Sequence, residues 1–427
     1  MLVSKPIEKN IFKRIIQENW EAFKKRYPQF DKAQYTEAVE KMLGCGEKEN
    51  GYACYACSSC GNMVAVSFSC KSSFCLSCGK VYTDNWMEKI SETLYEGMYY
   101  RHVVLTVPEE LRDYFFEDPS LMSELMRVGR EMLTEALSQW FRTEVEVGFI
   151  IVLHTAGRSG HWNPHLHIIM TSGGISKKTG NWRKLGYINY DMLHRKWRDH
   201  LFAMLKEKVG TPEIEEKLER LKERYPRGLV AYLDKGKMPH NSQGLARYLA
   251  KYVVSPPIAI GRILKYDGKQ VTYRYNDHET GRRKVDTVDV LKFIGLMVQH
   301  ILPKGFQRVR YFGLHATCKR PKVLPQLKKL LLIATRAIKG AYRVIKKTFQ
   351  KRVIDSGHKD PLICNKCGDT MFLYFIWHPR YGYIYDFLES AEDYEPRREE
   401  ETETGSPGAV GDRQGTQVQM LMPFMQI

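Results

Sequence analysis

The spacing of apolar residues predicts that the chain begins with helices. From residue 5 to residue 44 large apolar side chains recur at roughly helical spacing, which predicts two helices with one buried face each. A cysteine-rich stretch follows, and a further helical pattern leaves it at about residues 86–99. We therefore expect residues 1–95 to form an N-terminal unit of helices and a cysteine-rich segment.

Three strand-like segments come next, at residues 101–107, 145–154 and 165–171. A helical pattern separates the first from the second, and a loop joins the second to the third. The order strand, helix, strand, strand is typical of an α+β fold. We assign residues 96–318 to this second unit, which we expect to carry a polar, helical insertion or lid at residues 173–228.

The rest of the chain changes in composition. Residues 271–275 and 283–287 are predicted to form a hairpin. Residues 319–394 begin with a helical pattern rich in Lys and Arg, so we expect a basic helical region that also carries a C-x-x-C motif. The tail, 395–427, is biased toward Glu, Thr, Gly and Gln and is predicted to be disordered.

Charge indicates a polyanionic partner. The 427 residues include 66 Lys and Arg against 49 Asp and Glu, for a net charge of +17. Nucleic acid is the default partner for such an excess, and an anionic membrane surface is the weaker alternative. No apolar run approaches the roughly 20 residues of a membrane helix, and the first residues contain no signal-peptide core. We expect a cytoplasmic, nucleoid-associated protein without an ATP site, since no Walker loop is present.

Two C-x-x-C-G motifs predict a structural zinc site. They are Cys57-Ser-Ser-Cys60-Gly and Cys75-Leu-Ser-Cys78-Gly, and paired motifs of this kind close a tetrahedral four-thiolate site. Cys45 and Cys70 could complete a second site or be buried thiols.

A third C-x-x-C-G motif lies far downstream, at Cys364 and Cys367. It has no second C-x-x-C partner nearby. His315 and Cys318 are candidates for the missing ligands of a possible second zinc, and the alternative is an accessible pair of thiols.

A pair of histidines suggests a catalytic metal. His165 and His167 alternate along a predicted strand, so both imidazoles lie on one face of the sheet. His154 ends the preceding strand and is the preferred third ligand. His161 in the loop and Gln243 on a later helix are the alternatives.

A pair of tyrosines suggests a nucleophile. Tyr248 and Tyr252 are four residues apart on a short predicted helix, which places both phenols on one face. A phenol with a pKa of about 10 is a weak nucleophile, but it can attack a phosphodiester that a metal polarises. The product is a phosphotyrosine that keeps the energy of the broken bond, so rejoining needs no ATP. An aromatic stripe in the core is the alternative reading of the pair.

Other side chains near these motifs are candidates for DNA binding. Arg247 and Lys251 flank the tyrosines and would hold the phosphate backbone. Trp162, beside the histidines, would stack on an unpaired base, although ordinary packing accounts for it equally well.

Together these motifs resemble a known family, the two-tyrosine HUH transposases of rolling-circle bacterial insertion sequences (the IS91 type). HUH denotes two histidines around a hydrophobic residue, here His165-Leu166-His167. The resemblance covers roughly residues 10–320 and rests on several motifs in the same order: Cys57–Cys60, Phe74–Cys78, His102–Pro108, Trp162–His167, Arg247–Tyr252 and His300–Arg310.

The resemblance implies a zinc-binding N-terminal domain and a nuclease with a central antiparallel sheet flanked by helices. It implies cleavage of single-stranded DNA at transposon ends with Mg2+ or Mn2+, through a 5′-phosphotyrosine, and transfer to target DNA, with host replication or helicase factors as candidate partners. It makes Tyr248 and Tyr252 the nucleophiles and His165 and His167 metal ligands, and related relaxases support His154. The rival functions are a plasmid replication initiator or relaxase, and a zinc-dependent DNA-binding protein without nuclease activity.

Overall fold

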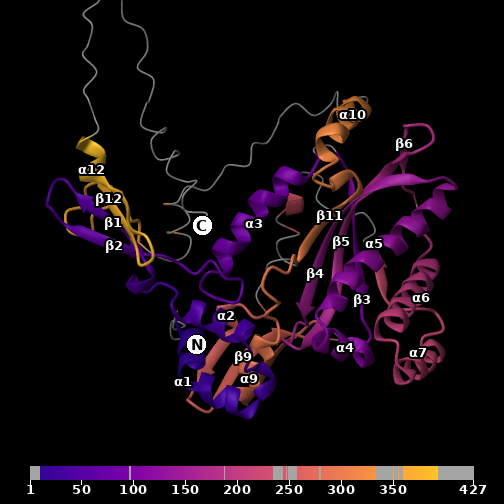
Figure 1. Cartoon of the computed structure of the whole chain (residues 1–427), viewed down its shortest axis with the longest axis horizontal. Helices are drawn as coiled ribbons and strands as arrows, with labels where there is room; N and C mark the ends of the chain where they lie inside the picture. Colours follow the sequence, from indigo (N-terminus) through magenta and orange to yellow (C-terminus); the bar gives the residue numbers. More distant parts are fainter. Residues whose placement is uncertain are drawn as a thin grey trace, which may run out of the picture.

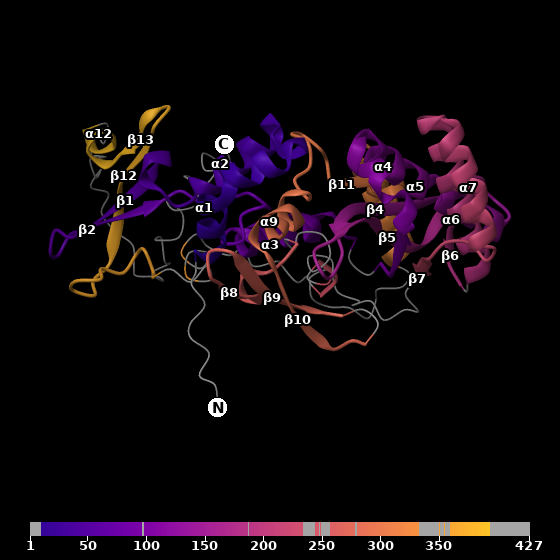
Figure 2. The same cartoon turned by 90° about the horizontal axis from the view of Figure 1, so that it is seen from below.

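The computed structural model describes residues 10–95, 98–186, 188–233, 244–246, 248, 257–277, 280–332, 350, 354 and 359–392 (Figure 1). Three antiparallel sheets organise these residues, with six, three and four strands. In both views the six-stranded and four-stranded sheets lie at opposite ends of the molecule, and the three-stranded sheet lies between them (Figure 2). The structure is α+β, as expected.

The six-stranded sheet has the order β11-β4-β5-β3-β7, and β6 pairs with β5. Its strands are β3 (Tyr100–Thr106), β4 (Val145–Ala156), β5 (Trp162–Ser176), β6 (Trp182–Lys184), β7 (Ala231–Leu233) and β11 (Val309–Phe312). The three predicted strands are confirmed as β3, β4 and β5. The centre of β4 and β5 is rich in Ile and Val, which favour strands and are buried on both faces of this sheet.

One face of this sheet packs against helices. Ile151, Leu153, Leu166 and Ile168 of β4 and β5 point into a core that they share with three helices. These are α5 (Ser120–Phe141), α6 (Tyr190–Val209) and α7 (Pro212–Arg224); the short helix α4 (Arg112–Glu117) lies beside α5.

The expected polar insertion, residues 173–228, is part of this core rather than a lid. Trp197 and Leu201 of α6 are completely buried against the face of the six-stranded sheet that α5 covers. Capping starts both helices, since the side chains of Asn189 and Thr211 accept hydrogen bonds from backbone N–H groups in the first turn. The exposed face of these helices is rich in Lys and Glu. This polar composition led the sequence analysis to predict an insertion or lid.

The opposite face of the sheet has a core of its own. Ile150, Val152 and Ile169 pack there with apolar residues from α3 (Gly79–Thr93), from α10 (Arg320–Leu332) and from Leu245 and Ala246. The helix predicted at residues 86–99 corresponds to α3, which begins seven residues earlier, at Gly79, directly after Cys78.

The N-terminal helices pack with a segment that we assigned to the second unit, residues 96–318. Helices α1 (Ile11–Arg26) and α2 (Ala33–Leu43) share one core with β8 (Ile263–Tyr266), β9 (Gln270–Asn276), β10 (Arg283–Asp289) and α9 (Val290–Val298). The predicted hairpin is confirmed as β9 and β10. Its buried Tyr273 packs on Phe293, with ring centroids 5.6 Å apart. Residues 263–298 of the second unit therefore share their core with the two N-terminal helices.

The four-stranded sheet joins two distant parts of the chain. Its order is β13-β12-β1-β2, and its strands are β1 (Tyr52–Cys57), β2 (Met63–Ser67), β12 (Met371–His378) and β13 (Gly382–Asp386), followed by α12 (Phe387–Glu392). The expectation of a helical region over 319–394 is wrong for β12 and β13. Their aromatic and β-branched residues favour strands, and β12 finds its partner in β1.

No helix among the described residues is both long and apolar enough to cross a membrane.

His315 is a buried histidine in the core beneath the sheet. Its side chain is only 2% exposed, and its ring stacks on Tyr95 and Tyr100, with centroids 4.8 and 5.7 Å away. Burial, with the positive charge of Arg320, lowers the pKa of His315 to about 3.

This burial predicts a loss of stability in mild acid. Between about pH 6.5 and pH 3 the unfolded chain binds a proton at His315 that the folded chain does not bind, so the free energy of unfolding falls as the pH falls. We expect His315→Phe, which keeps the stacked ring, to reduce that slope by about 1.4 kcal/mol per pH unit. Urea unfolding between pH 4 and pH 6 measures it, and the exposed His161→Phe is the control. An unchanged slope would contradict this account.

Candidate functional site

Three imidazoles meet where β4 ends and β5 begins. His154 in β4 lies directly opposite His165 in β5, and alternation along β5 places His167 on the same face. The Nδ1 atom of His154 is 3.3 Å from Nε2 of His165, whose Nε2 is 3.1 Å from Nε2 of His167. The expected trio is therefore brought together. His161 is exposed in the loop, outside this cluster, and Gln243 lies outside the described residues.

Hydrogen bonds orient the two HUH imidazoles. The Nδ1–H of His165 donates to the backbone oxygen of Asn163, 2.7 Å away, which leaves the lone pair of Nε2 directed at the cluster. The Nδ1 atom of His167 is 2.9 Å from Nε2 of His102, so its Nε2 is likewise directed at the cluster. Such outer contacts fix the tautomer and orientation of histidine ligands in metal sites.

His102 connects this cluster to Tyr248. It lies in β3 and is 3% exposed, and its Nδ1 atom is 3.0 Å from the hydroxyl oxygen of the half-buried Tyr248. Sequence reasoning missed this residue as a site residue. The available signal was a histidine in the strand next to the HUH strand, on the same face as Thr106, the residue opposite His165.

The cluster is electrostatically suited to a cation. Burial lowers the pKa of His154, His165 and His167, and for His154 and His167 the neighbouring imidazoles lower it further. All three are therefore neutral near pH 7 and present lone pairs. Three neutral imidazoles fit a divalent transition ion such as Mn2+ better than Mg2+, which prefers oxygen ligands.

Of the remaining residues predicted for catalysis or DNA binding, the structure describes only Trp162. Tyr252, Arg247 and Lys251 lie outside the described residues. Trp162 stacks on His300 and meets Phe116 edge to face, so packing accounts for its ring. Its role in DNA binding stays a prediction.

The cysteines form two clusters, and neither is the predicted one. The predicted set of Cys57, Cys60, Cys75 and Cys78 is divided between the clusters. The first cluster joins Cys45, Cys70, Cys75 and Cys78, and the second joins Cys57, Cys60, Cys364 and Cys367.

The fold explains this division. The β1–β2 hairpin carries Cys57 and Cys60 into the four-stranded sheet, whereas Cys75 and Cys78 precede α3 and meet Cys45 just after α2. In the first cluster the Sγ atom of Cys78 is 3.4 Å from that of Cys45 and 3.6 Å from that of Cys70.

His315 and Cys318, the other candidate zinc ligands, belong to neither cluster. His315 lies in the aromatic stack with Tyr95 and Tyr100, and Cys318 is an exposed free thiol. The predicted ligand set of His315, Cys318, Cys364 and Cys367 is therefore wrong. Because β12 pairs with β1, Cys364 and Cys367 lie beside Cys57 and Cys60 instead.

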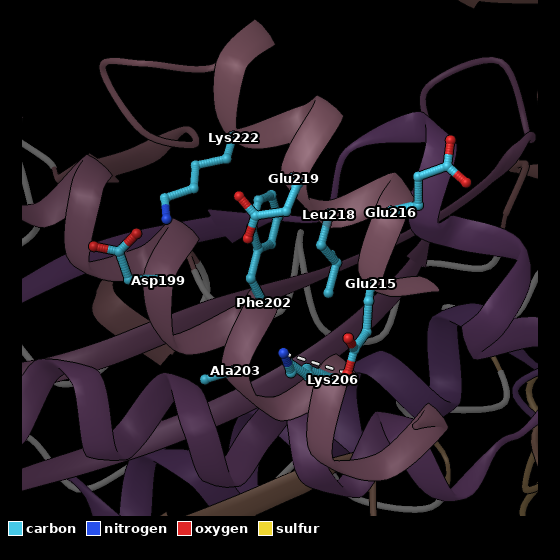
Figure 3. A pocket seen from close by; sticks show the side chains of 9 residues that line it. All are labelled: Asp199, Phe202, Ala203, Lys206, Glu215, Glu216, Leu218, Glu219 and Lys222. Atoms are coloured by element: carbon cyan, nitrogen blue, oxygen red, sulfur yellow. Dashed lines mark ion pairs between the residues drawn. The ribbon is translucent and has the colours of Figure 1, made fainter. Parts of the chain in front are cut away.

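A groove of about 390 Å3 lies between α6 and α7, away from the histidines. Figure 3 shows its charged rim, where Lys206 and Glu215 form an ion pair of 3.3 Å. These helices pack on the sheet through the face opposite to the histidine cluster. The groove therefore plays no part in the site.

Comparisons with known proteins identify the family of this chain. A family model described as a putative transposase matches residues 148–322, and a transposase zinc-binding domain matches residues 15–107. The transposase for insertion sequence element IS801 of Pseudomonas savastanoi pv. phaseolicola is 30% identical over 351 residues, covering 78% of this chain and 82% of its own. The chain belongs to the IS91-type transposases.

A second relative of this transposase is the putative transposase y4qJ of Sinorhizobium fredii (strain NBRC 101917 / NGR234), 30% identical over 292 residues, which cover 65% of this chain and 73% of that protein. No solved structure matches the chain. Because the chain is a transposase, its substrate is DNA. The match to a zinc-binding domain and the two cysteine clusters support the binding of Zn2+.

The histidine cluster predicts a binding site for one Mn2+ ion. We expect His165→Ala and His167→Ala to weaken Mn2+ binding by roughly 100-fold, since outer-shell substitutions alone cost about 10- to 100-fold. Quenching of the electron paramagnetic resonance signal of free Mn2+ on titration measures the affinity. His161→Ala, in the neighbouring loop, is the matched control. Unchanged Mn2+ affinity in His167→Ala would remove the histidines from the metal site.

Proposed function

We propose that this transposase nicks single-stranded DNA at the ends of its element by tyrosine attack, and then transfers the strand to target DNA by a rolling-circle mechanism. The observation that carries the proposal is the continuous chain of contacts from the histidine cluster through His102 to Tyr248. Family membership supports DNA strand transfer as the reaction.

A divalent ion held by His154, His165 and His167 would polarise the scissile phosphate and stabilise the charge that develops during attack. The protein itself supplies the geometry. Each imidazole is placed by a strand of the central sheet, and the pairing of β4 with β5 sets the spacing of the ligand atoms. Burial keeps the imidazoles unprotonated in the absence of the ion.

Tautomers link the ligand His167 to the nucleophile. When Nε2 of His167 serves as a ligand, its proton resides on Nδ1 and is donated to Nε2 of His102. The proton of His102 then resides on Nδ1 and is donated to the hydroxyl oxygen of Tyr248. That hydrogen bond favours the phenolate, which is the nucleophilic form.

The chemistry balances without a nucleotide cofactor. The phenol of Tyr248 gives its proton to water and its oxygen attacks phosphorus, the bond from phosphorus to the 3′ oxygen breaks, and the 3′ oxygen takes up a proton from water to become a hydroxyl. The 5′ side of the strand stays on the tyrosine as a phosphodiester. A free 3′ hydroxyl reverses the step and rejoins DNA. Tyr252, four residues further along the sequence, is the proposed second nucleophile.

A metal-dependent covalent adduct tests this function. We expect the parent protein, with Mn2+ and labelled single-stranded DNA from its element ends, to give a protein–DNA band that survives denaturation. The double variant Tyr248→Phe/Tyr252→Phe should give none, because both phenols are gone. The exposed Tyr232→Phe is the matched control. Tight binding with no adduct would favour a DNA-binding protein without nuclease activity.

Substitution of His102 tests its contact with Tyr248. In the Tyr252→Phe background only Tyr248 can attack, and we expect His102→Leu there to slow adduct formation by roughly 10- to 100-fold at saturating Mn2+ and DNA. Quenched-flow measurement of the adduct gives the rate. A positioning role also predicts partial rescue by His102→Gln, whose amide can donate to the phenol. An equal rate in His102→Leu and its background would contradict the role.

A further inference from the structure

We infer that Cys57, Cys60, Cys364 and Cys367 hold a second structural zinc ion, which fastens the C-terminal strands to the N-terminal domain. Cys364 and Cys367 lie outside both matched family regions, which end at residues 107 and 322. The inference does not depend on the proposed nuclease activity.

The sulfur positions fit zinc and exclude disulfides. The Sγ atoms of Cys57 and Cys367 are 3.5 Å apart, and those of Cys60 and Cys364 are 3.6 Å apart. Each of the four Sγ atoms lies within 4.8 Å of the others. A tetrahedral site with zinc–sulfur bonds of about 2.3 Å separates its sulfurs by roughly 3.8 Å. A disulfide needs about 2.05 Å.

The two motifs form the same turn, although 307 positions separate Cys57 from Cys364 in the sequence. In each motif the backbone N–H of the first cysteine bonds to the carbonyl five residues on, Asn62 for Cys57 and Asp369 for Cys364. In each, the N–H of the following glycine bonds back to the carbonyl of the first cysteine. Both glycines, Gly61 and Gly368, have a positive φ.

Donors directed at sulfur are a further sign of a thiolate site. The backbone N–H of Lys366 lies 3.4 Å from the Sγ atom of Cys364, and the side-chain amide of Asn62 lies 3.5 Å from it. Asn62 also donates to Asn365, which ties one turn to the other. Hydrogen bonds of this kind favour the charged form of a cysteine.

The sheet around the site explains why a metal is needed. β1 pairs with β12, and Cys57 lies opposite Met371 in that register. Among the described residues the apolar core of this sheet has six buried members, two of which are cysteines: Ala53, Tyr55, Cys57, Cys364, Met371 and Ile376. A core this small does not usually hold strands from two ends of a chain, and structural zinc supplies the missing free energy in such units.

Zinc content per chain tests the inference. Inductively coupled plasma mass spectrometry on the full-length protein should find two zinc ions. Cys364→Ser/Cys367→Ser should retain one, and so should Cys75→Ser/Cys78→Ser, because the clusters share no ligand. Cys54→Ala is the matched control with two ions, since Cys54 is buried in β1 but belongs to neither cluster.

A conservative variant separates ligand loss from misfolding. Cys367→His keeps four ligands of a common zinc set, so we expect two zinc ions, and cobalt substitution should give tetrahedral spectra with reduced thiolate-to-cobalt charge transfer. One zinc ion in the parent protein, or two in Cys364→Ser/Cys367→Ser, would overturn the inference.

Discussion

The pairing register between β4 and β5 is the constraint on which the site depends. It sets His154 opposite His165, and the two-residue repeat of β5 then places His167 beside them. A shift of one residue would turn the HUH imidazoles to the face that packs on α5. The register is anchored by the apolar residues of both strands, which are buried on both faces of the sheet. Stability and site geometry therefore rest on the same contacts.

Burial gives the histidines their chemical character. Burial lowers the pKa of all three histidines, so the imidazoles are neutral near pH 7. Neutral nitrogen atoms bind a metal ion without first losing a proton. The same burial places Tyr248 in contact with His102, on the sheet face where α3 and α10 pack. One layer of packing thus supports the histidine cluster and the proposed nucleophile together.

Local patterns were sufficient to predict the strands and the histidine cluster. Alternation along β5 predicted that His165 and His167 share a face, and a short loop after His154 brought the third imidazole back. Cysteine pairing was not predictable in this way, because spacing identifies a C-x-x-C motif but not its partner. Cys57 pairs with a motif more than 300 residues away, through strand pairing that only the folded chain reveals. His102 was missed for a similar reason, since its role arises from contacts across strands.

The central claim is that a tyrosine becomes covalently joined to the 5′ side of the cut strand. The most direct measurement is mass spectrometry of the trapped adduct after protease and nuclease digestion. We predict a nucleotide attached through a 5′ phosphate to the peptide that contains Tyr248 and Tyr252, with a free 3′ hydroxyl on the released strand. A 5′ phosphate on free DNA, with no modified peptide, would show that water is the nucleophile and would contradict the account.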